Sequence, residues 1–322
     1  MLLLDELRFP NGSKVIDVPG GSGLYGQATL GARLFKSGSM ASDVGCIVIA
    51  GNDLPESAVD LLKSWEMTLL LVRDADKPCT RGLLQYEDDA FGPAHLGESS
   101  LVFASSFHFL AVPEDLEIQV SMLLRMREEL GVTERPLIVW EPAPLGCDSV
   151  NLASHLKACR LVDVFSPNRS ELRYLIEGKT ESEVEFSPSA VEAQARTFLE
   201  AGIGPNGDGL AIIRSGEHGV LTMSNNIKAE WFPAYYEKGA TEVIDATGAG
   251  NTFVGAFAVA FQETKNRKEA SLRAAVAASF ALEQFGPPKL TASSGSSGEL
   301  WNGTDVLSRL RDFKTRIYER DI

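Results

Sequence analysis

Cysteine and histidine are scarce in this sequence of 322 residues, and their positions argue against a metal centre. The four cysteines are Cys46, Cys79, Cys147 and Cys159, none of which forms a C-x-x-C pair, and the four histidines have no metal-ligand spacing. The pattern therefore predicts neither a zinc site nor a disulfide framework. Reduced thiols are typical of a cytoplasmic protein, and we expect the histidines to have structural roles.

Basic residues and long apolar runs are also lacking. The chain has 30 Lys and Arg against 44 Asp and Glu, a net charge of −14 at pH 7. This balance disfavours sequence-independent nucleic-acid binding, which requires basic side chains to neutralise phosphates, and it disfavours anionic membrane surfaces. No apolar run approaches a membrane span, and the start, "MLLLDEL", is too short and acidic for a signal peptide. We expect a cytoplasmic protein without nucleic-acid or membrane partners.

Apolar residues are plentiful, at 44%, which is enough for one large α/β domain or two ordinary ones. Short β-branched runs alternate with helical patterns along the chain. Strands are expected at 44–51, 106–112, 136–142, 161–167, 209–214 and 219–224, and helices at 55–66, 114–130, 149–160, 168–177 and 305–317. This alternation predicts a mostly parallel sheet with helices on both faces.

Two stretches have few apolar residues. Residues 6–19 contain two prolines and a glycine, and residues 73–99 are dense in Asp and Glu. We expect them to form a small polar lid over one end of the sheet. The segment "TASSGSSG", 291–298, is predicted to be a flexible loop within the domain because only a short segment follows it. The sequence therefore predicts one domain, 1–322, with an appended lid.

Residues 245–251, "DATGAGN", meet the physical requirements of an anion-binding turn. Gly248 and Gly250 can adopt positive φ, so successive backbone N–H groups can point at one spot. We expect a strand to end just before this turn and a long helix to begin in it, which would add the helix's positive end. Such a cradle can position and neutralise a phosphoryl group during transfer. An ordinary glycine-bearing helix start is the alternative.

Two further motifs have the residues that a nucleotide site needs. "SPNRSEL" places Asn168 and Glu171 three residues apart at a strand-to-helix junction, where they can order Mg²⁺ near phosphates, although the same spacing is common in helix caps. "RSGEHGV" places Gly216 and Gly219 in a turn between two strands, against which a nucleotide can lie, with a plain hairpin turn as the alternative.

The segment 21–26, "GSGLYG", also matches the G-x-G-x-x-G pattern of dinucleotide-binding folds, with Asp43 about 20 residues further on. However, the preceding "VIDVP" ends in proline, and no strong buried strand leads into the turn. Asp43 also precedes its predicted strand, whereas the acidic residue of such folds ends one. A nicotinamide enzyme is therefore disfavoured.

Four motifs, in this order along the chain, resemble those of the PfkB or ribokinase-like family of carbohydrate and nucleoside kinases. They are "PGGSGLYGQATLGARL", "SPNRSEL", "RSGEHGV" and "DATGAGNTFVGAF", of which the last is the most specific. The resemblance covers nearly the whole chain and implies an α/β fold, a three-layer αβα sandwich with a mostly parallel sheet and a small β-lid. "MLLLDELRF", "VWEPAPLGC" and Asn251 are similar to one fungal branch, the maintenance-of-killer proteins.

The resemblance implies a role for each matching residue. Acceptor-binding positions are Asp5, Gly20 and Gly21; nucleotide-binding positions are Asn168, Glu171, Arg214, Gly216, Glu217, Gly219 and Ala278; the anion hole is Gly248, Ala249 and Gly250. Glu171 would hold Mg²⁺, directly or through water, and Asp245 and Thr247 would support a monovalent cation such as K⁺. The implied activity is ATP-dependent phosphoryl transfer to a hydroxyl of a small sugar or nucleoside-like acceptor, by a monomer or a lid-mediated homodimer.

Asn251 departs from the family pattern, because the family normally has an aspartate there that takes the acceptor's proton. An amide cannot do so at neutral pH, and losing a positioned base costs about 10²–10⁴-fold in rate. Arg214 and Ser215 also depart, standing where many members have Thr-Leu. Three alternatives stay open: a slow or atypical kinase, a catalytically silent nucleotide- or sugar-binding pseudokinase, and an engineered inactivating change, which the resemblance to the fungal branch disfavours.

Overall fold

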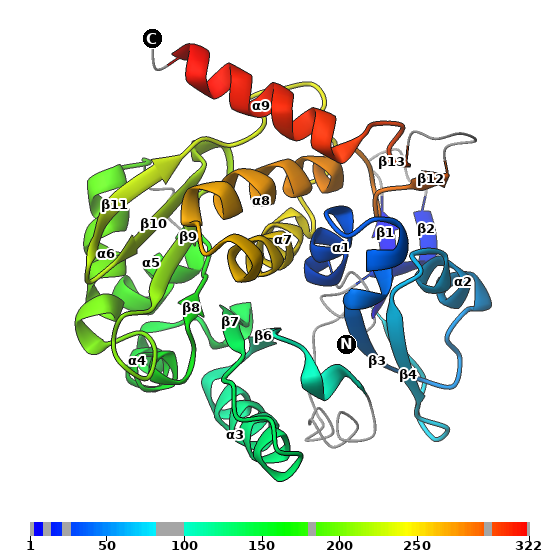
Figure 1. Cartoon of the computed structure of the whole chain (residues 1–322), viewed down its shortest axis with the longest axis horizontal. Helices are drawn as coiled ribbons and strands as arrows, with labels where there is room; N and C mark the ends of the chain where they lie inside the picture. The colour runs from blue at the N-terminus through cyan, green and yellow to red at the C-terminus, as the bar shows by residue number, and fades with distance from the viewer. Residues whose placement is uncertain are drawn as a thin grey trace. The chain divides into compact units, whose positions relative to one another are not determined.

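A computed structural model of the chain describes residues 3–8, 14–20, 27–81, 100–179, 185–292 and 298–320. The contacts divide the chain into two compact units, which we describe separately. The first unit combines residues 1–91 with 239–322, and the second comprises residues 92–238. Figure 1 shows the elements of both.

The second unit contains a sheet of six strands in the order β11-β10-β9-β8-β7-β6. The strands are β6 (Ser106–Ala111), β7 (Leu137–Pro142), β8 (Val164–Phe165), β9 (Leu210–Arg214), β10 (Val220–Ser224) and β11 (Ile227–Phe232). The first four run parallel, and the last two add antiparallel strands at one edge. Each residue of β10 is buried, as are the first four of β9, as expected for strands covered on both faces. The prediction of a mostly parallel sheet is confirmed.

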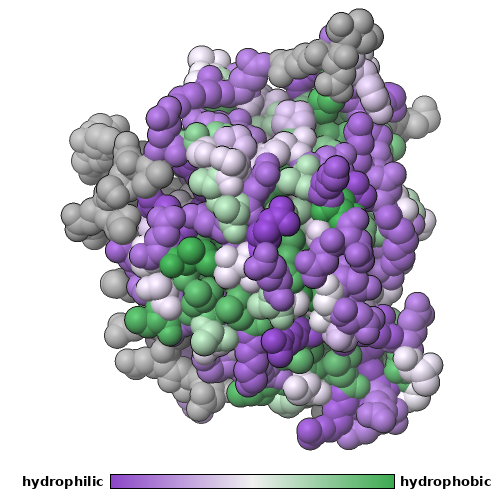
Figure 2. All heavy atoms as spheres, turned by 90° about the vertical axis from the view of Figure 1, so that its left-hand side faces the viewer, coloured by the Kyte–Doolittle hydropathy of each residue, from purple (hydrophilic) through white to green (hydrophobic). Residues whose placement is uncertain are grey.

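Four helices pack with this sheet: α3 (Pro113–Glu129), α4 (Leu152–Ala158), α5 (Arg169–Glu177) and α6 (Pro188–Ala201). Proline at the first helical position fixes φ where no N–H donor is needed, and α3 and α6 both begin this way. The core contains stacked aromatic rings: Phe165 lies 5.1 Å from Trp140 and 4.7 Å from Phe198 between centroids, and all three are fully buried. Hydrophilic residues cover most of the face that carries α6 and β11, with hydrophobic residues among them (Figure 2).

The first unit contains two parallel strands joined by a helix: β3 (Gly45–Ala50), α2 (Glu56–Ser64) and β4 (Thr68–Arg73). It also contains α1 (Gln27–Leu34), α7 (Ala249–Thr264), α8 (Arg267–Leu282) and α9 (Val306–Arg320). A hairpin joins β12 (Leu290–Ala292) to β13 (Glu299–Trp301). A separate three-stranded sheet has the order β2-β1-β5, formed by β1 (Leu3–Arg8), β2 (Lys14–Gly20) and β5 (Thr80–Arg81).

Helices α1 and α7 approach each other closely at Gly31. A Cβ atom at this position would lie 1.9 Å from the carbonyl oxygen of Thr252 and 2.9 Å from the backbone nitrogen of Ala256. Only glycine therefore permits this backbone-to-backbone approach. The contact fixes the first turns of α7 against α1.

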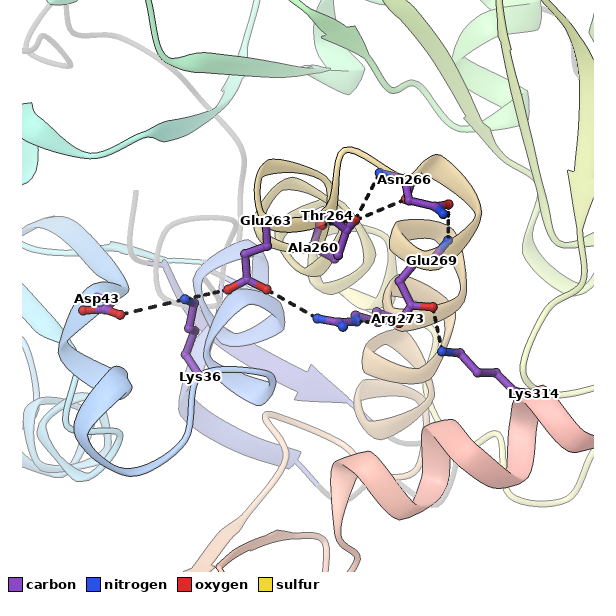
Figure 3. A network of polar contacts seen from close by, with 9 residues as sticks. All are labelled: Lys36, Asp43, Ala260, Glu263, Thr264, Asn266, Glu269, Arg273 and Lys314. Carbon is purple, nitrogen blue, oxygen red and sulfur yellow. Dashed lines mark hydrogen bonds and ion pairs between the residues drawn. The ribbon is translucent and has the colours of Figure 1, made fainter. Parts of the chain in front are cut away.

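Ion pairs connect four helices of the first unit (Figure 3). Lys36, just after α1, lies 2.6 Å from Glu263 of α7, and Glu263 lies 3.4 Å from Arg273 of α8. Glu269 of α8 then pairs with Arg273 at 2.9 Å and with Lys314 of α9 at 2.6 Å. These side chains are partly exposed, so each ion pair contributes little to the stability of the fold by itself. Together the pairs connect α1 to α7, α7 to α8 and α8 to α9.

A buried ion pair joins α1 to the β12–β13 hairpin. The guanidinium of Arg33 is fully buried and donates hydrogen bonds to both carboxylate oxygens of Glu299, at 2.7 and 2.8 Å. Its Nε donates to the carbonyl of Trp65 at 2.6 Å, and the guanidinium lies over the ring of Trp301. Such bidentate geometry satisfies a buried charge that would otherwise be costly.

Most of the predicted helices and strands are present in the described part of the chain, with three corrections. The strand predicted at 161–167 is reduced to β8, because Cys159–Leu161 form a 3₁₀ turn before it and Pro167 has no N–H to continue the ladder after it. The helix predicted at 149–160 is α4 flanked by 3₁₀ turns. No strand precedes the 245–251 turn: in that part of the described chain, residues 241–248 are turn and coil. The stretches predicted to form a lid, 6–19 and 73–99, contain the end of β1, most of β2 and β5, and their residues 9–13 and 82–99 lie outside the described residues. Among the described helices, none is long and apolar enough to cross a bilayer.

Candidate functional site

The amino terminus of α7 has the predicted left-handed glycine at Gly248 but not at Gly250, which lies in the first turn of the helix without a positive φ. Gly248 is the N-cap, with φ 77° and ψ −4°, a left-handed conformation that glycine adopts without steric cost. The N–H of Thr252 donates to the carbonyl of Gly248 at 3.0 Å. The amino-terminal end of a helix carries partial positive charge from its aligned peptide dipoles, which favours an anion there. This end of a 16-residue helix is therefore a candidate phosphate site.

Asn251 lies on the first turn of α7, three residues after the N-cap, and is half-buried. Its amide can donate and accept hydrogen bonds, but it has no basic site at neutral pH. The predicted base position is thus in the first turn beside Gly250, with a group that can orient a hydroxyl and cannot deprotonate it.

Asp245 and Thr247 interact with each other just before this turn. One carboxylate oxygen, Oδ1 of Asp245, accepts the backbone N–H of Thr247 at 2.9 Å and its hydroxyl at 2.8 Å. The N–H groups of Ile244 and Asp245 donate to the carbonyl of Leu282 at the end of α8, at 2.8 and 3.2 Å. The turn is therefore attached to the end of the helix that contains Ala278. A monovalent cation at Asp245 and Thr247 stays a prediction.

Asn168 and Glu171 form a complete capping box at the start of α5. Asn168 Oδ1 accepts the N–H of Glu171 at 2.9 Å, and Glu171 Oε2 accepts the N–H of Asn168 at 2.7 Å. The helix-cap alternative for this motif is therefore present in the structure. Both side chains are engaged with the backbone at the position where the resemblance implies a metal.

Arg214, at the end of β9, lies between two buried carboxylates. Its Nη2 is 2.7 Å from Glu141 Oε1 and 3.5 Å from Glu171 Oε2, and it donates to the carbonyl of Ser166 at 3.0 Å. Glu141 Oε2 is 3.2 Å from His108 Nε2. Burial raises the pKa of Glu171, and the positive charge of Arg214 opposes that rise. The middle of β6, the carboxyl ends of β7 and β9 and the start of α5 thus share one buried cluster of charged and polar groups.

Sequence reasoning missed Glu141 and His108. Glu141 is the one acidic residue in the buried run "LIVWEP", and a charge at the end of a central strand is the signal that identifies it. His108 lies in β6 beside β7, where register pairs it with Val139. The contact of His108 with Glu141 could be predicted only if the order of the strands in the sheet were known.

The turn between β9 and β10 has the two glycine conformations expected there. Gly216 has φ 58° and Gly219 has φ 85°, and a Cβ at Gly219 would lie 2.0 Å from the carbonyl oxygen of Phe232. Glu217 lies 3.1 Å from Lys238 Nζ. The ring of His218 stacks on Phe186, with 3.7 Å between centroids. The turn is therefore rigid at Gly219, and its aromatic side lies against the start of α6.

The predicted acceptor residues are less fully described. Asp5 lies in β1 paired with Val18, and Gly20 lies at the end of β2 paired with Leu3. Gly21 lies outside the described residues. The predicted residues therefore fall into groups within each unit: Asn168, Glu171, Arg214, Gly216, Glu217 and Gly219 in the second, and Asp5, Gly20, Asp245, Thr247, Gly248, Ala249, Gly250, Asn251 and Ala278 in the first.

Comparisons with known proteins identify the same family. The profile of the pfkB family carbohydrate kinases matches residues 99–291. An uncharacterized protein of Schizosaccharomyces pombe is 30% identical, covering 97% of this chain and 91% of its own length. Protein MAK32 of Saccharomyces cerevisiae is 29% identical over 97% of this chain and 89% of its own length.

Solved structures share the fold. A putative ribokinase II from E. coli, in complex with ATP and Mg²⁺, superposes with a TM-score of 0.66 at 17% identity, covering 98% of this chain and 96% of that one. At this identity the likeness establishes the fold alone. The ribokinase-like α/β fold predicted from the sequence is confirmed.

Proposed function

The chain belongs to the pfkB family of carbohydrate kinases, and from that premise we propose that it binds ATP and transfers the terminal phosphoryl group slowly to a hydroxyl of a small molecule. The acceptor proposed is a sugar or a nucleoside-like compound. The start of α7 is the observation that carries the proposal: a left-handed glycine N-cap at the positive end of a 16-residue helix. The side-chain amide of Asn251, on the same turn, accounts for the slow rate.

The chemistry proposed for this turn is electrostatic. The N–H groups of Gly250 and Asn251, with the positive end of α7, would neutralise charge on the phosphoryl oxygens as transfer proceeds. Neutralisation of this kind provides much of the stabilisation in phosphoryl transfer, and it does not depend on a base. Asn251 would orient the acceptor hydroxyl, and the proton of that hydroxyl would leave to solvent.

The missing base determines how much slower phosphoryl transfer is expected to be. A positioned general base typically contributes about 10²–10⁴-fold, which corresponds to roughly 3–5 kcal/mol of barrier. Binding of nucleotide does not use the base, so we expect affinity to be retained while turnover falls by this factor.

A second candidate function is that of a catalytically silent nucleotide- or sugar-binding protein. The specific observation in its favour is that two family positions are altered together: residue 251 is an amide, and Arg214, where many members have threonine, pairs with Glu171. Such a protein would bind nucleotide without consuming it. Cytoplasmic location and a monomeric or lid-paired dimeric state are further parts of the proposal.

The test is phosphoryl transfer by the full chain and its Asn251→Asp variant across a panel of sugars and nucleosides with ATP. The kinase proposal predicts transfer by the variant that exceeds the wild-type rate by about 10²-fold or more. Asn266→Asp is the matched control, because Asn266 caps α8 through its Oδ1 and an aspartate can keep that hydrogen bond. It should leave transfer unchanged.

If Asn251→Asp is folded and binds ATP but transfers no faster than the wild type to any acceptor, the kinase proposal is wrong and the silent binding protein is favoured. If wild-type transfer is already as fast as that of the variant, the role assigned to residue 251 is wrong.

A further inference from the structure

Arg214 is a permanently charged group fixed inside the second unit. Its side chain is 11% exposed, and those of Glu141 and Glu171 are 5% and 9% exposed. A guanidinium carries its positive charge without a bound metal, and its planar fork can pair with more than one carboxylate. A positive charge is therefore built in beside both carboxylates, at the carboxyl ends of parallel strands, where α/β sheets bind ligands.

Other contacts hold this charge in position. Arg214 Nη2 also donates to the Ser166 carbonyl at the end of β8, so the guanidinium is hydrogen-bonded across the neighbouring strand. His108 contacts the far oxygen of Glu141, Oε2, which keeps the carboxylate oriented toward Arg214 with Oε1. Moving the guanidinium away would leave two buried carboxylates uncompensated, which is costly.

The donor set around Glu171 does not fit Mg²⁺. This ion requires oxygen ligands at about 2.0–2.1 Å in near-octahedral geometry. Glu171 Oε2 already accepts the N–H of Asn168 and faces Arg214. A divalent cation at Glu171 would also be repelled by the adjacent guanidinium.

Arg214 supplies one positive charge at the place where a divalent metal would supply two. A polyphosphate approaching Glu141 and Glu171 alone would meet two negative charges, and a divalent cation would be needed between them. With Arg214 in place, one of those charges is already compensated within the protein. The need for a cation brought in by the nucleotide is correspondingly reduced.

We propose that Arg214 is the resident cation of the candidate nucleotide site, and that this chain binds nucleotides without Mg²⁺. Uncomplexed ATP and ADP then bind about as tightly as their magnesium complexes. The inference rests on the proposed nucleotide binding and specifies the ionic form of the ligand.

The experiment is titration calorimetry of the full chain with ATP and with ADP, in buffer containing EDTA and in buffer containing excess MgCl₂. The expected result for the wild type is dissociation constants that agree within about threefold between the two buffers, less than 1 kcal/mol in binding free energy. Binding only in MgCl₂ overturns the inference and leaves nucleotide binding intact. Binding in neither buffer overturns the proposed function itself, and the inference with it.

The paired variant Glu141→Gln with Arg214→Thr tests the residue. It removes the cation together with one of its anionic partners, so Glu141 is not left as an unpaired buried charge. We expect its affinity for ATP in EDTA to fall by about tenfold or more and to recover in MgCl₂. If its response to MgCl₂ equals that of the wild type, Arg214 is not the resident cation. The wild-type comparison decides the metal dependence alone if this variant does not fold.

Arg135→Thr is the matched control. Arg135 precedes β7, at the opposite end of the same parallel strands, where it lies 3.7 Å from Asp163. It removes one arginine from the same unit without changing the cluster at the carboxyl ends. Its dissociation constants should match those of the wild type in both buffers, and a metal response altered as in the paired variant would overturn the assignment.

Discussion

Replacing Gly31 by alanine tests whether the packing of α1 on α7 sets the position of the candidate phosphate site. The new Cβ would lie 1.9 Å from the Thr252 carbonyl oxygen and 2.8 Å from its carbonyl carbon. Van der Waals contact needs roughly 3.5 Å, so the two helices must separate by roughly 1.5 Å. Both nearby groups are backbone and cannot rotate away, so the whole first half of α7 must move.

The expected cost follows from two opposing terms. Overpacking costs about 1–3 kcal/mol, and contact with backbone favours the upper end of this range. Alanine recovers about 1 kcal/mol through its higher helix propensity than glycine. The net destabilisation is about 2 kcal/mol, which corresponds to a fall in Tm of about 3 °C for a chain of this size.

The assay is thermal and urea unfolding of the Gly31→Ala variant, followed by melting with ATP. We expect the lower Tm and a smaller rise with ATP, because the N–H groups at the start of α7 are displaced. Gly239→Ala is the control: its φ is 78°, and a Cβ there would have no neighbour within 4 Å. It should cost about 1–2 kcal/mol through backbone strain and leave the ATP response unchanged. A Gly31→Ala variant that melts within 1 °C of the wild type would refute the reasoning.

Two further predictions concern titratable groups. Burial raises the pKa of the Cys147 thiol to about 12. Iodoacetamide at pH 8 should therefore leave Cys147 unmodified in the folded chain and modify it in urea, as measured by peptide mass spectrometry. Rapid alkylation of Cys147 in the folded chain would contradict this prediction. Burial opposes ionisation of Glu299, but hydrogen bonds from Arg33 and the Gly38 N–H hold its pKa below the ordinary value. Its charged form therefore stabilises the fold at neutral pH, and this contribution is lost as the pH falls through the lowered pKa. The Glu299→Gln variant should lose about 1.5–3 kcal/mol of unfolding free energy at pH 7 and less at pH 3–4. Urea unfolding of the wild type and the variant at each pH measures this loss. A loss that is the same at every pH would contradict the assignment.

Much of the fold could be predicted because its signals are local. Apolar runs such as 136–142 gave strands, and Pro55, the observed N-cap of α2, marked a helix start. The false strand before Asp245 shows the limit of this reasoning. Val243 and Ile244 are apolar and β-branched, yet they are 39% and 51% exposed, and the N–H of Ile244 bonds to the end of α8. A strand pattern without a neighbouring strand does not form a ladder.

The candidate site was predictable where its geometry depends on neighbours in sequence. The left-handed conformation of Gly248 follows from the glycine turn, and the capping box of Asn168 and Glu171 follows from their spacing. The pairing of Arg214 with Glu141 was not predictable. It requires β8 to lie between β7 and β9 and to be short enough for the guanidinium to reach across it, and both are properties of the assembled sheet.

The close approach at Gly31 is an intermediate case. Gly31 lies within the quoted motif "PGGSGLYGQATLGARL", but a glycine inside a helical pattern has several explanations, and only the position of α7 shows which applies.

The most direct test of the central claim is the melting temperature of the unmodified chain with ATP, ADP and GTP, measured with recovery of the nucleotide afterwards. A ligand at 100 times its Kd stabilises the folded state by about 2.7 kcal/mol. The account predicts a clear rise in Tm with at least one of these nucleotides, and recovery of most of the ATP unconsumed. No rise with any of the three would contradict it.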